Sequence, residues 1–342
     1  MNSRWNLLHL ARGSDLIYFG IQDYEKEDDA MFKKVLVPTD FSGYAHRMQE
    51  CLTSVPGIEE IVLLHVLDAG NPMSLEKMGW SYDTLIDEAR TRLAEQADHM
   101  ARGLKTNLGV KPLLKVIVEP MSGADGVNLQ RLKPQEGVQV IDGGSVGEAI
   151  VRTAAGEAVS LICMGAQGKG LVEGMLLGSV STEVLRNAEC DLLIIRHRAL
   201  DTEGEKGAQG KLCQNIFSKI MLTTDFSSAG EEAIIRAEEL NGVHEILLVY
   251  VIGSDGEFDE AASRLNLLRE RLASKDRKVT VHVLQGHPAK EILTLAKKQD
   301  VSLIMMSSQG KSWSRQIRVG STTFDVSRRA ECPVLVVRNK KR

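Results

Sequence analysis

The feature that most constrains the fold of this chain is an internal repeat. The segment KIMLTTDFS at 219–227 mirrors KVLVPTDFS at 34–42, and 246–251 mirrors 61–66, both at a separation of 185 positions. Further on, VSLIMMSSQGK at 301–311 mirrors VSLICMGAQGK at 159–169 at a separation of 142 positions. A repeat of this length predicts two similar domains, and the smaller second separation assigns 43 extra residues to the first of them.

Each half alternates short apolar runs with amphipathic segments. Continuous runs such as VLV at 35–37 and IVLLHVL at 61–67 are typical of strands buried on both faces. We expect further strands at 113–118, 138–141, 159–164 and 191–196, and helices at 43–54, 81–107, 146–158 and 179–187. The pattern predicts an α/β fold of two repeated, five-stranded, Rossmann-like parallel-sheet domains.

Composition shifts give the expected boundaries of these domains. Residues 1–30 form an N-terminal extension that ends in the charge run EKEDD, and 198–215 is a polar, glycine-containing linker. The first domain is expected at 31–197, with an insertion within about 68–137, and the second at 216–342.

Bulk properties exclude several classes of function. The formal net charge is −4, which gives no support to binding of nucleic acid or of an anionic membrane. No apolar run has the length of a membrane span, and the first 20 residues lack the apolar core of a secretory signal. The five cysteines are far apart, without a C-x-x-C or zinc spacing, so the cytoplasm is the expected location.

A glycine-rich loop is the main candidate for a binding site. The stretch LICMGAQGKGLVEGMLLGSVS (161–181) joins an expected strand to a helix that begins near Ser179. Glycine lets backbone N–H groups approach an anion, because it lacks a Cβ and adopts positive φ, and a helix N-terminus adds open donors. The spacing fits neither a P-loop nor a GxGxxG fingerprint, so a phosphate cradle and a purely structural turn both remain open.

The repeated motifs together resemble the universal stress protein family in its tandem, two-domain form. They are VLVPTDFS, LLHV, and the loop G-x2-G-x9-GS followed by AECDLLIIR, and the resemblance covers most of 32–197 and 216–339. It implies an adenine nucleotide alpha hydrolase-like fold and ATP as ligand, with Mg²⁺ as an optional companion. It also implies that Asp40 contacts the ribose and that the Val66 backbone contacts adenine. The residues that would hold the phosphates are Gly165, Gly168, Gly178 and Ser179.

The second half keeps part of this pattern. The counterparts of the first-domain site residues are Asp225, Val251, Gly310, Gly320 and Ser321, while Ser307 replaces the first loop glycine. Trp313 also makes the second loop bulkier. Two interpretations remain open: a site for AMP or another phosphorylated ligand, and a degenerate site kept for packing.

The function that these observations favour is a nucleotide-dependent regulatory module in stress response. No general base paired with a nucleophile and no Walker lysine stand out, so we expect at most weak ATP hydrolysis. A slow ATPase and a partner-binding protein with vestigial sites are the alternatives, and the protein partner is unknown. The apolar runs at 191–196 and 333–337 resemble dimerising edge strands, which predicts an internal pseudo-dimer and allows a homodimer.

Overall fold

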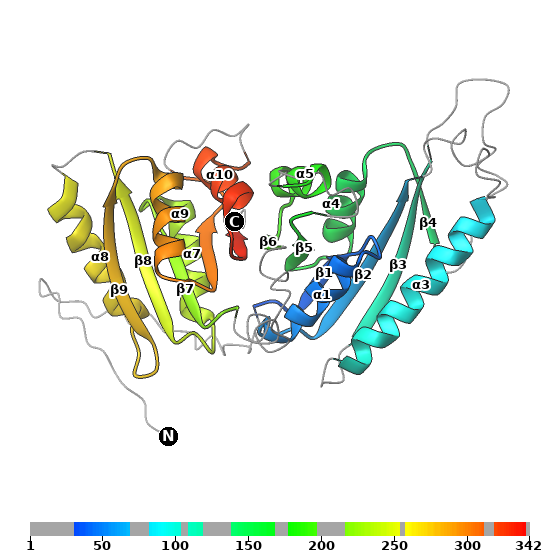
Figure 1. Ribbon diagram of the computed structural model, residues 1–342, viewed down its shortest axis with the longest axis horizontal. Coiled ribbons are helices and arrows are strands. Elements are labelled where there is room, and N and C mark those ends of the chain that lie inside the picture. The colour runs from blue at the N-terminus through cyan, green and yellow to red at the C-terminus, as the bar shows by residue number, and fades with distance from the viewer. Residues whose placement is uncertain are drawn as a thin grey trace, which may run out of the picture.

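The two halves of the chain share one continuous eleven-stranded sheet (Figure 1). The computed structural model describes residues 31–68, 82–103, 109–118, 138–167, 177–196, 216–253, 257–310 and 318–339. The strand order is β4-β3-β2-β1-β5-β6-β11-β10-β7-β8-β9, and neighbouring strands are parallel within each half. The α/β class with two repeated parallel-sheet units is therefore confirmed.

The elements alternate as the sequence predicts. The first half comprises β1 (Lys34–Pro38), α1 (Gly43–Glu50), the 3₁₀ helix η1 (Cys51–Ser54), β2 (Glu60–Asp68), α3 (Tyr82–Gly103), β3 (Gly109–Val118), β4 (Val138–Asp142), α4 (Val146–Gly156), β5 (Leu161–Gly165), α5 (Ser179–Asn187) and β6 (Asp191–Ile195). The second half comprises β7 (Lys219–Thr223), α7 (Ser228–Glu239), β8 (Glu245–Ile252), α8 (Phe258–Leu272), β9 (Lys278–Gln285), α9 (Pro288–Lys298), β10 (Leu303–Ser307), α10 (Ser321–Arg329) and β11 (Val334–Val337). None of the described helices is both long and apolar enough to cross a membrane.

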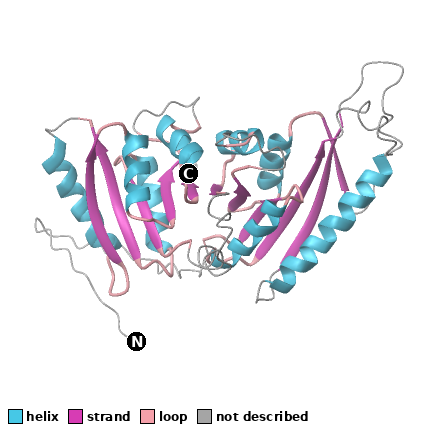
Figure 2. Ribbon diagram, in the orientation of Figure 1, coloured by secondary structure: helices cyan, strands magenta, loops and turns pink. Residues whose placement is uncertain are grey.

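Helices cover both faces of the sheet (Figure 2). Alternate residues of one strand belong to different cores: Val35 and Val37 of β1 pack with α1 and α3, whereas Leu36 packs with α4 and α5. Because each strand is buried from both sides, the apolar runs are continuous rather than alternating.

The first half contains six strands, so the prediction of a five-stranded domain is wrong for this half. β3 pairs with β2 from Glu60↔Gly109 to Asp68↔Ile117 and takes the place that β9 takes beside β8. The strand at 138–142, which the repeat spacing aligned with β9, lies beyond β3 as an additional edge strand. The insertion thus adds a strand to the sheet. The repeat spacing could not reveal this, because α4 after β4 and α9 after β9 are still separated by 142 positions.

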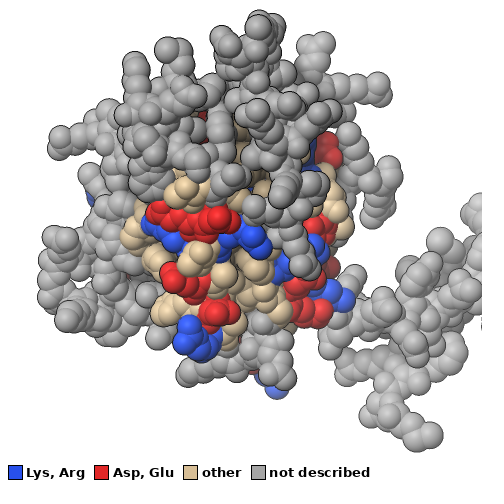
Figure 3. Space-filling view, turned by 90° about the vertical axis from the view of Figure 1, so that its right-hand side faces the viewer, with Lys and Arg blue, Asp and Glu red and all other residues tan. Residues whose placement is uncertain are grey.

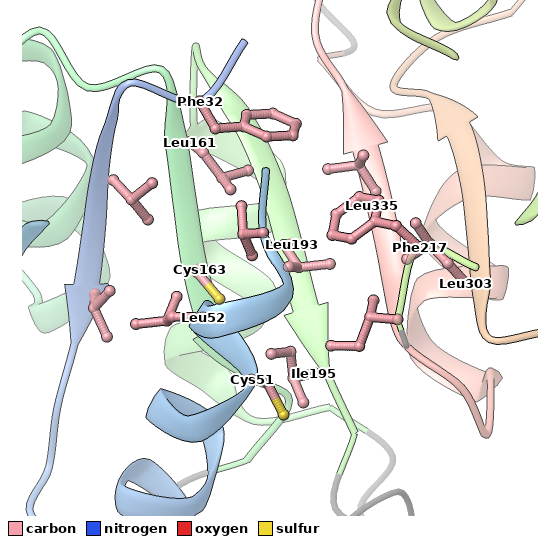
Figure 4. Close-up of a cluster of buried hydrophobic side chains, with 14 of the residues drawn as sticks. Phe32, Cys51, Leu52, Leu161, Cys163, Leu193, Ile195, Phe217, Leu303 and Leu335 are labelled. Atoms are coloured by element: carbon pink, nitrogen blue, oxygen red, sulfur yellow. The ribbon is translucent and has the colours of Figure 1, made fainter. Parts of the chain in front are cut away.

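β6 and β11 join the two halves by antiparallel pairing. Their register is Val334↔Ile194, Leu335↔Leu193 and Val336↔Leu192. Leu193 and Leu335 occupy the same position in the repeat, so the junction has local two-fold pseudosymmetry. Figure 4 shows these two side chains near Phe217 and Leu303, and all four belong to one buried cluster.

Two buried arginines cross this junction in opposite directions. Arg196 follows β6 and donates through Nη2 to the carbonyl oxygen of Ser327 in α10, and Arg338 follows β11 and donates through Nη2 to that of Leu185 in α5. Their exposed fractions are 7% and 5%, and burial lowers the pKa of each guanidinium to about 10, so both stay charged at neutral pH. A cation at the C-terminal end of a helix is favoured by the open carbonyls there.

The junction is also asymmetric. The buried Asp191 accepts a hydrogen bond from the backbone N–H of Arg338 at 2.8 Å and lies 3.3 Å from Nε of Arg236. The position in the second half that corresponds to Asp191 is Pro333. Only one side of the junction therefore combines an arginine with a buried carboxylate at this position.

We predict that Arg338→Ala lowers the free energy of unfolding by about 2–4 kcal/mol. The truncation removes the donor to the Leu185 carbonyl, leaves a cavity, and takes a cation away from the buried Asp191. Arg318→Ala is the matched control, because Arg318 also donates to the end of α5, at the Asn187 carbonyl (3.1 Å), but its side chain is 53% exposed. The control should lose less than about 1 kcal/mol in urea unfolding. Equal losses in the two variants would contradict a special role for the buried arginine.

Candidate functional site

A tight turn at the carboxyl end of β1 positions the first site residue. Phe41 has φ 59°, its N–H donates to Thr39 Oγ1 at 3.1 Å, and the Ser42 N–H donates to Asp40 Oδ1 at 2.9 Å. Ser42 Oγ then accepts from the Ala45 N–H at 3.2 Å, which caps α1. The turn thus places the Asp40 carboxylate and the start of α1 together at the end of the strand.

An aromatic stack supports the strained residue of this turn. A left-handed φ at a bulky residue costs about 1–3 kcal/mol and persists only where the surroundings impose it. The Phe41 ring lies 4.2 Å from the His65 ring, between centroids, and the Arg92 guanidinium lies 4.7 Å from the Phe41 ring. His65 Nδ1 is 2.8 Å from the Thr39 carbonyl oxygen, which can only accept, so Nδ1 carries the proton.

The second half repeats this support with other side chains. Phe226 also has φ 59°, its ring lies 4.7 Å from that of Tyr250, and the Arg264 guanidinium lies 4.0 Å from it. The repeated Asp-Phe-Ser motif was visible in the sequence, but the left-handed backbone and the arginine partners were not. These positioning residues are what sequence reasoning missed.

The main chain of Val66 faces open space beside β1. The Glu60 N–H donates to Lys33 O (2.9 Å) and the Thr39 N–H donates to Leu64 O (2.8 Å), so every second residue of β2 directs its main chain towards β1. β1 has ended at its last pair, Pro38↔Leu64, before Val66 is reached. The Val66 N–H and C=O are therefore directed at the space beyond β1.

The loop after β5 leads into the N-terminus of α5. The Ala166 N–H donates to Ile195 O and the Gly178 N–H donates to Ala166 O, both at 2.9 Å. α5 begins at Ser179, and its N-cap, Gly178, makes no side-chain capping bond. The first N–H groups of α5 and its partial positive charge thus remain available for a ligand.

The two described loop glycines, Gly165 and Gly178, do not have an unusual backbone conformation. Gly178 has φ −67°, and Gly165 is absent from the described glycines with positive φ, so neither uses the left-handed conformation that is open to glycine. A Cβ at Gly165 would lie 3.2 Å from the Gln167 carbonyl oxygen, and one at Gly178 would meet nothing closer than 3.5 Å. The protein itself therefore has room for a methyl group at Gly178. Because Gly178 lines the cavity, the lack of a side chain there leaves that room to a ligand.

These elements enclose a cavity of about 350 Å³ at the carboxyl ends of β1, β2 and β5. Five of the six residues predicted for the first domain line it: Asp40, Val66, Gly165, Gly178 and Ser179. The sixth, Gly168, lies outside the described residues. The lining also includes apolar side chains (Met48, Leu64, Val146, Ile150 and Met164) and further polar ones (Thr39, Ser42, Gln167 and Ser181). The volume and this mixture suit a small molecule with one apolar and one charged end.

The second half differs at the corresponding positions. Ser307 donates through Oγ to the Gln309 carbonyl oxygen at 2.7 Å, so a hydroxyl fills the space that Gly165 leaves open. Asp225 Oδ1 accepts from the Ser227 N–H (3.0 Å) and Oγ (2.5 Å), and a Cβ at Gly310 would lie only 2.5 Å from Asp225 Oδ2. The loop after β10 therefore lies directly against this carboxylate, and the counterpart of Gly310 in the first half, Gly168, lies outside the described residues.

The other predicted residues of the second half keep the geometry of the first. The Thr224 N–H donates to Val249 O at 3.0 Å, so Val251 has the main-chain direction of Val66, and Gly320 caps α10 at Ser321 with φ −68°. A cavity of about 290 Å³ in this half is lined by Phe226, Tyr250, Glu257, Glu260, Ala261 and Arg264, none of which is a predicted site residue. Trp313 lies outside the described residues.

Two further findings bear on chemistry. Cys163 is fully buried, and burial raises the pKa of its thiol to about 12, which suits a core residue and not a nucleophile. Within the described ranges, no group of three or more His, Cys, Asp or Glu residues is arranged to hold a metal ion.

On the end of the molecule turned to the viewer in Figure 3, acidic and basic side chains are interspersed among the described residues.

Comparison with known proteins identifies the family. The model of the universal stress protein family matches residues 31–196 and 217–338, and the chain belongs to this family. Universal stress protein MJ0577 of Methanocaldococcus jannaschii is 30% identical over 157 residues, which cover 36% of this chain and 97% of that protein. Universal stress protein YxiE of Bacillus subtilis is 33% identical over 110 residues, covering 32% of this chain and 74% of that protein. A crystal structure of a universal stress protein from Archaeoglobus fulgidus covers 90% of this chain and 98% of its own, with a TM-score of 0.61 and 23% identity, and so supports the tandem fold.

We predict that Gly165→Ser changes the free energy of unfolding by less than about 1 kcal/mol. Ser307 at the same place in the repeat shows that a hydroxyl can donate to the loop carbonyl there. Ser307→Gly is the reciprocal control, and chemical denaturation of both variants measures the effect. A large loss of stability in Gly165→Ser would mean that this glycine is required for folding, and not for an open cavity.

Proposed function

We propose that the first domain binds an adenine nucleotide, in the first instance ATP, and acts as a nucleotide-dependent regulatory module in stress response. The observation that carries this proposal is the cavity of about 350 Å³, because it joins a free main-chain edge, a carboxylate and a helix N-terminus in one space. Membership of the universal stress protein family is consistent with it.

The base and the ribose would occupy the end of the cavity formed by β1 and β2. A purine edge carries neighbouring donors and acceptors, which the N–H and C=O of Val66 can match. Leu64, Ile150 and Met164 offer apolar contact to its faces. The Asp40 carboxylate, held by the Ser42 N–H, can accept hydrogen bonds from ribose hydroxyls through its second oxygen.

The phosphates would occupy the end formed by the start of α5. The N–H groups near Gly178 and Ser179 attract anions through the helix dipole, and the exposed Ser179 hydroxyl can donate as well. Mg²⁺, if it accompanies ATP, would be held mainly by phosphate oxygens and water, as is usual for this ion.

The polar groups of the cavity favour binding over hydrolysis. Among its described lining residues, Asp40 is the sole carboxylate and His65 the sole imidazole. Both already make hydrogen bonds that hold the turn, Asp40 with the Ser42 N–H and His65 with the Thr39 carbonyl. We therefore propose that occupancy of the site, and not turnover, is the signal that a protein partner reads.

For the second domain we propose a weaker site of different selectivity, for AMP or another phosphorylated ligand. Val251, Gly320 and Ser321 retain the features of the first site, but Asp225 Oδ1 accepts a hydrogen bond from the Ser227 hydroxyl, and Ser307 stands in the place of Gly165. A ligand that needs this carboxylate has to displace those contacts, which costs affinity.

We predict that Asp40→Asn weakens ATP binding at least about tenfold, whereas Asp225→Asn changes the tight binding event little. Asparagine keeps an acceptor for the Ser42 N–H, so the turn should survive while the charged acceptor for the ribose is lost. Isothermal titration calorimetry of the full chain measures the affinity and the number of sites, and thermal unfolding checks that each variant is folded. Unchanged ATP affinity in folded Asp40→Asn, or a larger loss in Asp225→Asn, would contradict the assignment to the first domain.

A further inference from the structure

The two ends of the sheet differ in how their outer strand is covered. In the first half, β3 lies beside β2 and is itself covered by β4, in the register Leu114↔Val138 to Val118↔Asp142. In the second half, β9 lies beside β8 in the same place, and no described strand pairs with its outer side. Figure 1 shows β9 and α8 at one end of the molecule and β4 and α3 at the other.

The outer edge of β9 presents a regular set of backbone groups. The Lys278 N–H donates to His244 O at 2.8 Å and the Gly286 N–H donates to Ile252 O at 3.3 Å. In a parallel ladder the inward groups recur at every second residue, so 278, 280, 282, 284 and 286 face β8. Val279, Val281 and Val283 therefore direct their N–H and C=O groups outward. An eight-residue edge strand of this kind is a template for pairing with another strand.

The helix that packs on β9 carries two exposed apolar side chains. Among the described residues the large hydrophobic side chains with high exposure are Val140, Phe258 and Leu267. Phe258 (50% exposed) and Leu267 (65%) belong to α8, which packs on β9. The two side chains are nine residues apart and so point to opposite sides of α8, which means that only one of them can add apolar surface beside a strand pair at β9.

The sequence of β9 is complementary to itself. Antiparallel pairing of two copies about a two-fold axis at Val281 places Val281 opposite its own counterpart and Val279 opposite Val283 of the second copy. All three are outward residues, so each such pair exchanges two hydrogen bonds. On the other face, Thr280 lies opposite His282 of the second copy, which keeps the two imidazoles from facing each other directly.

We propose that the open edge of β9 is a homodimerisation surface, at which two copies of this chain join their sheets antiparallel about Val281. The junction inside the chain follows the same rule, because Leu193 pairs there with its repeat equivalent, Leu335. A two-fold pair closes on itself, whereas pairing of β9 with β4 of the next copy would build an open chain of molecules.

Sedimentation velocity of the full-length protein over a range of concentrations tests this surface. Wild-type protein should form a dimer. Val281→Lys should raise the dimer dissociation constant about tenfold or more, because it places like charges opposite each other at the centre of the interface. Val140→Lys puts the same charge on the edge strand at the opposite end and should leave the dimer unchanged; Val140 is 44% exposed whereas Val281 packs against the core, so folding of both variants is compared as well.

Three outcomes would overturn the proposal: a wild-type protein that stays monomeric, a dimer that Val281→Lys does not weaken, or equal weakening by Val140→Lys. If Val281→Lys fails to fold by circular dichroism, residue-resolved hydrogen exchange of the wild-type protein decides. The amides of Val279, Val281 and Val283 should then exchange more slowly as concentration rises, and exchange that is independent of concentration would reject the interface.

Discussion

The antiparallel pairing of β6 with β11 is the interaction on which the rest of the structure depends. It turns two open parallel sheets into one and lets Arg196 and Arg338 each donate a hydrogen bond to a helix of the opposite half. Each guanidinium binds the C-terminal end of a helix, α10 or α5, whose first turn lies at a candidate ligand site. The N-termini of α5 and α10, which carry partial positive charge, point at these sites. The C-terminal end of each helix is bound by an arginine of the other half. A buried cation is costly unless it is satisfied, so the two halves are tied to one relative placement.

The two halves share one plan but differ in how much space it encloses. Both contain a left-handed phenylalanine held by a ring and an arginine, and both begin their last helix with a glycine and a serine. The first half leaves a cavity between these features, because Gly165 lacks a side chain there. In the second half the Ser307 hydroxyl bonds to its own loop and Gly310 approaches Asp225 closely. Among the described residues, the Ser307 hydroxyl in place of Gly165 is therefore a side-chain difference between the two sites, whereas Gly168, the counterpart of Gly310, lies outside them.

Much of this architecture could be predicted from the sequence, because it depends on local pattern and on repetition. The apolar runs identified the strands, and the helix expected at 179–187 has those bounds in α5. What could not be predicted depends on long-range geometry. Strand pairing decided that β3, and not the strand at 138–142, lies beside β2. Likewise, the crossed arginines occupy strand ends that look alike in sequence, and the strained φ of Phe41 is set by partners on β2 and α3.

The most direct test of the central claim is a crystal structure of the full chain with a non-hydrolysable ATP analogue. We expect the analogue in the cavity of the first half, with adenine against the Val66 main chain and the ribose at Asp40. The phosphates should lie at the first N–H groups of α5, near Ser179. An analogue bound only in the second half, or bound away from these three contacts, would show that the cavity of the first half is not the nucleotide site.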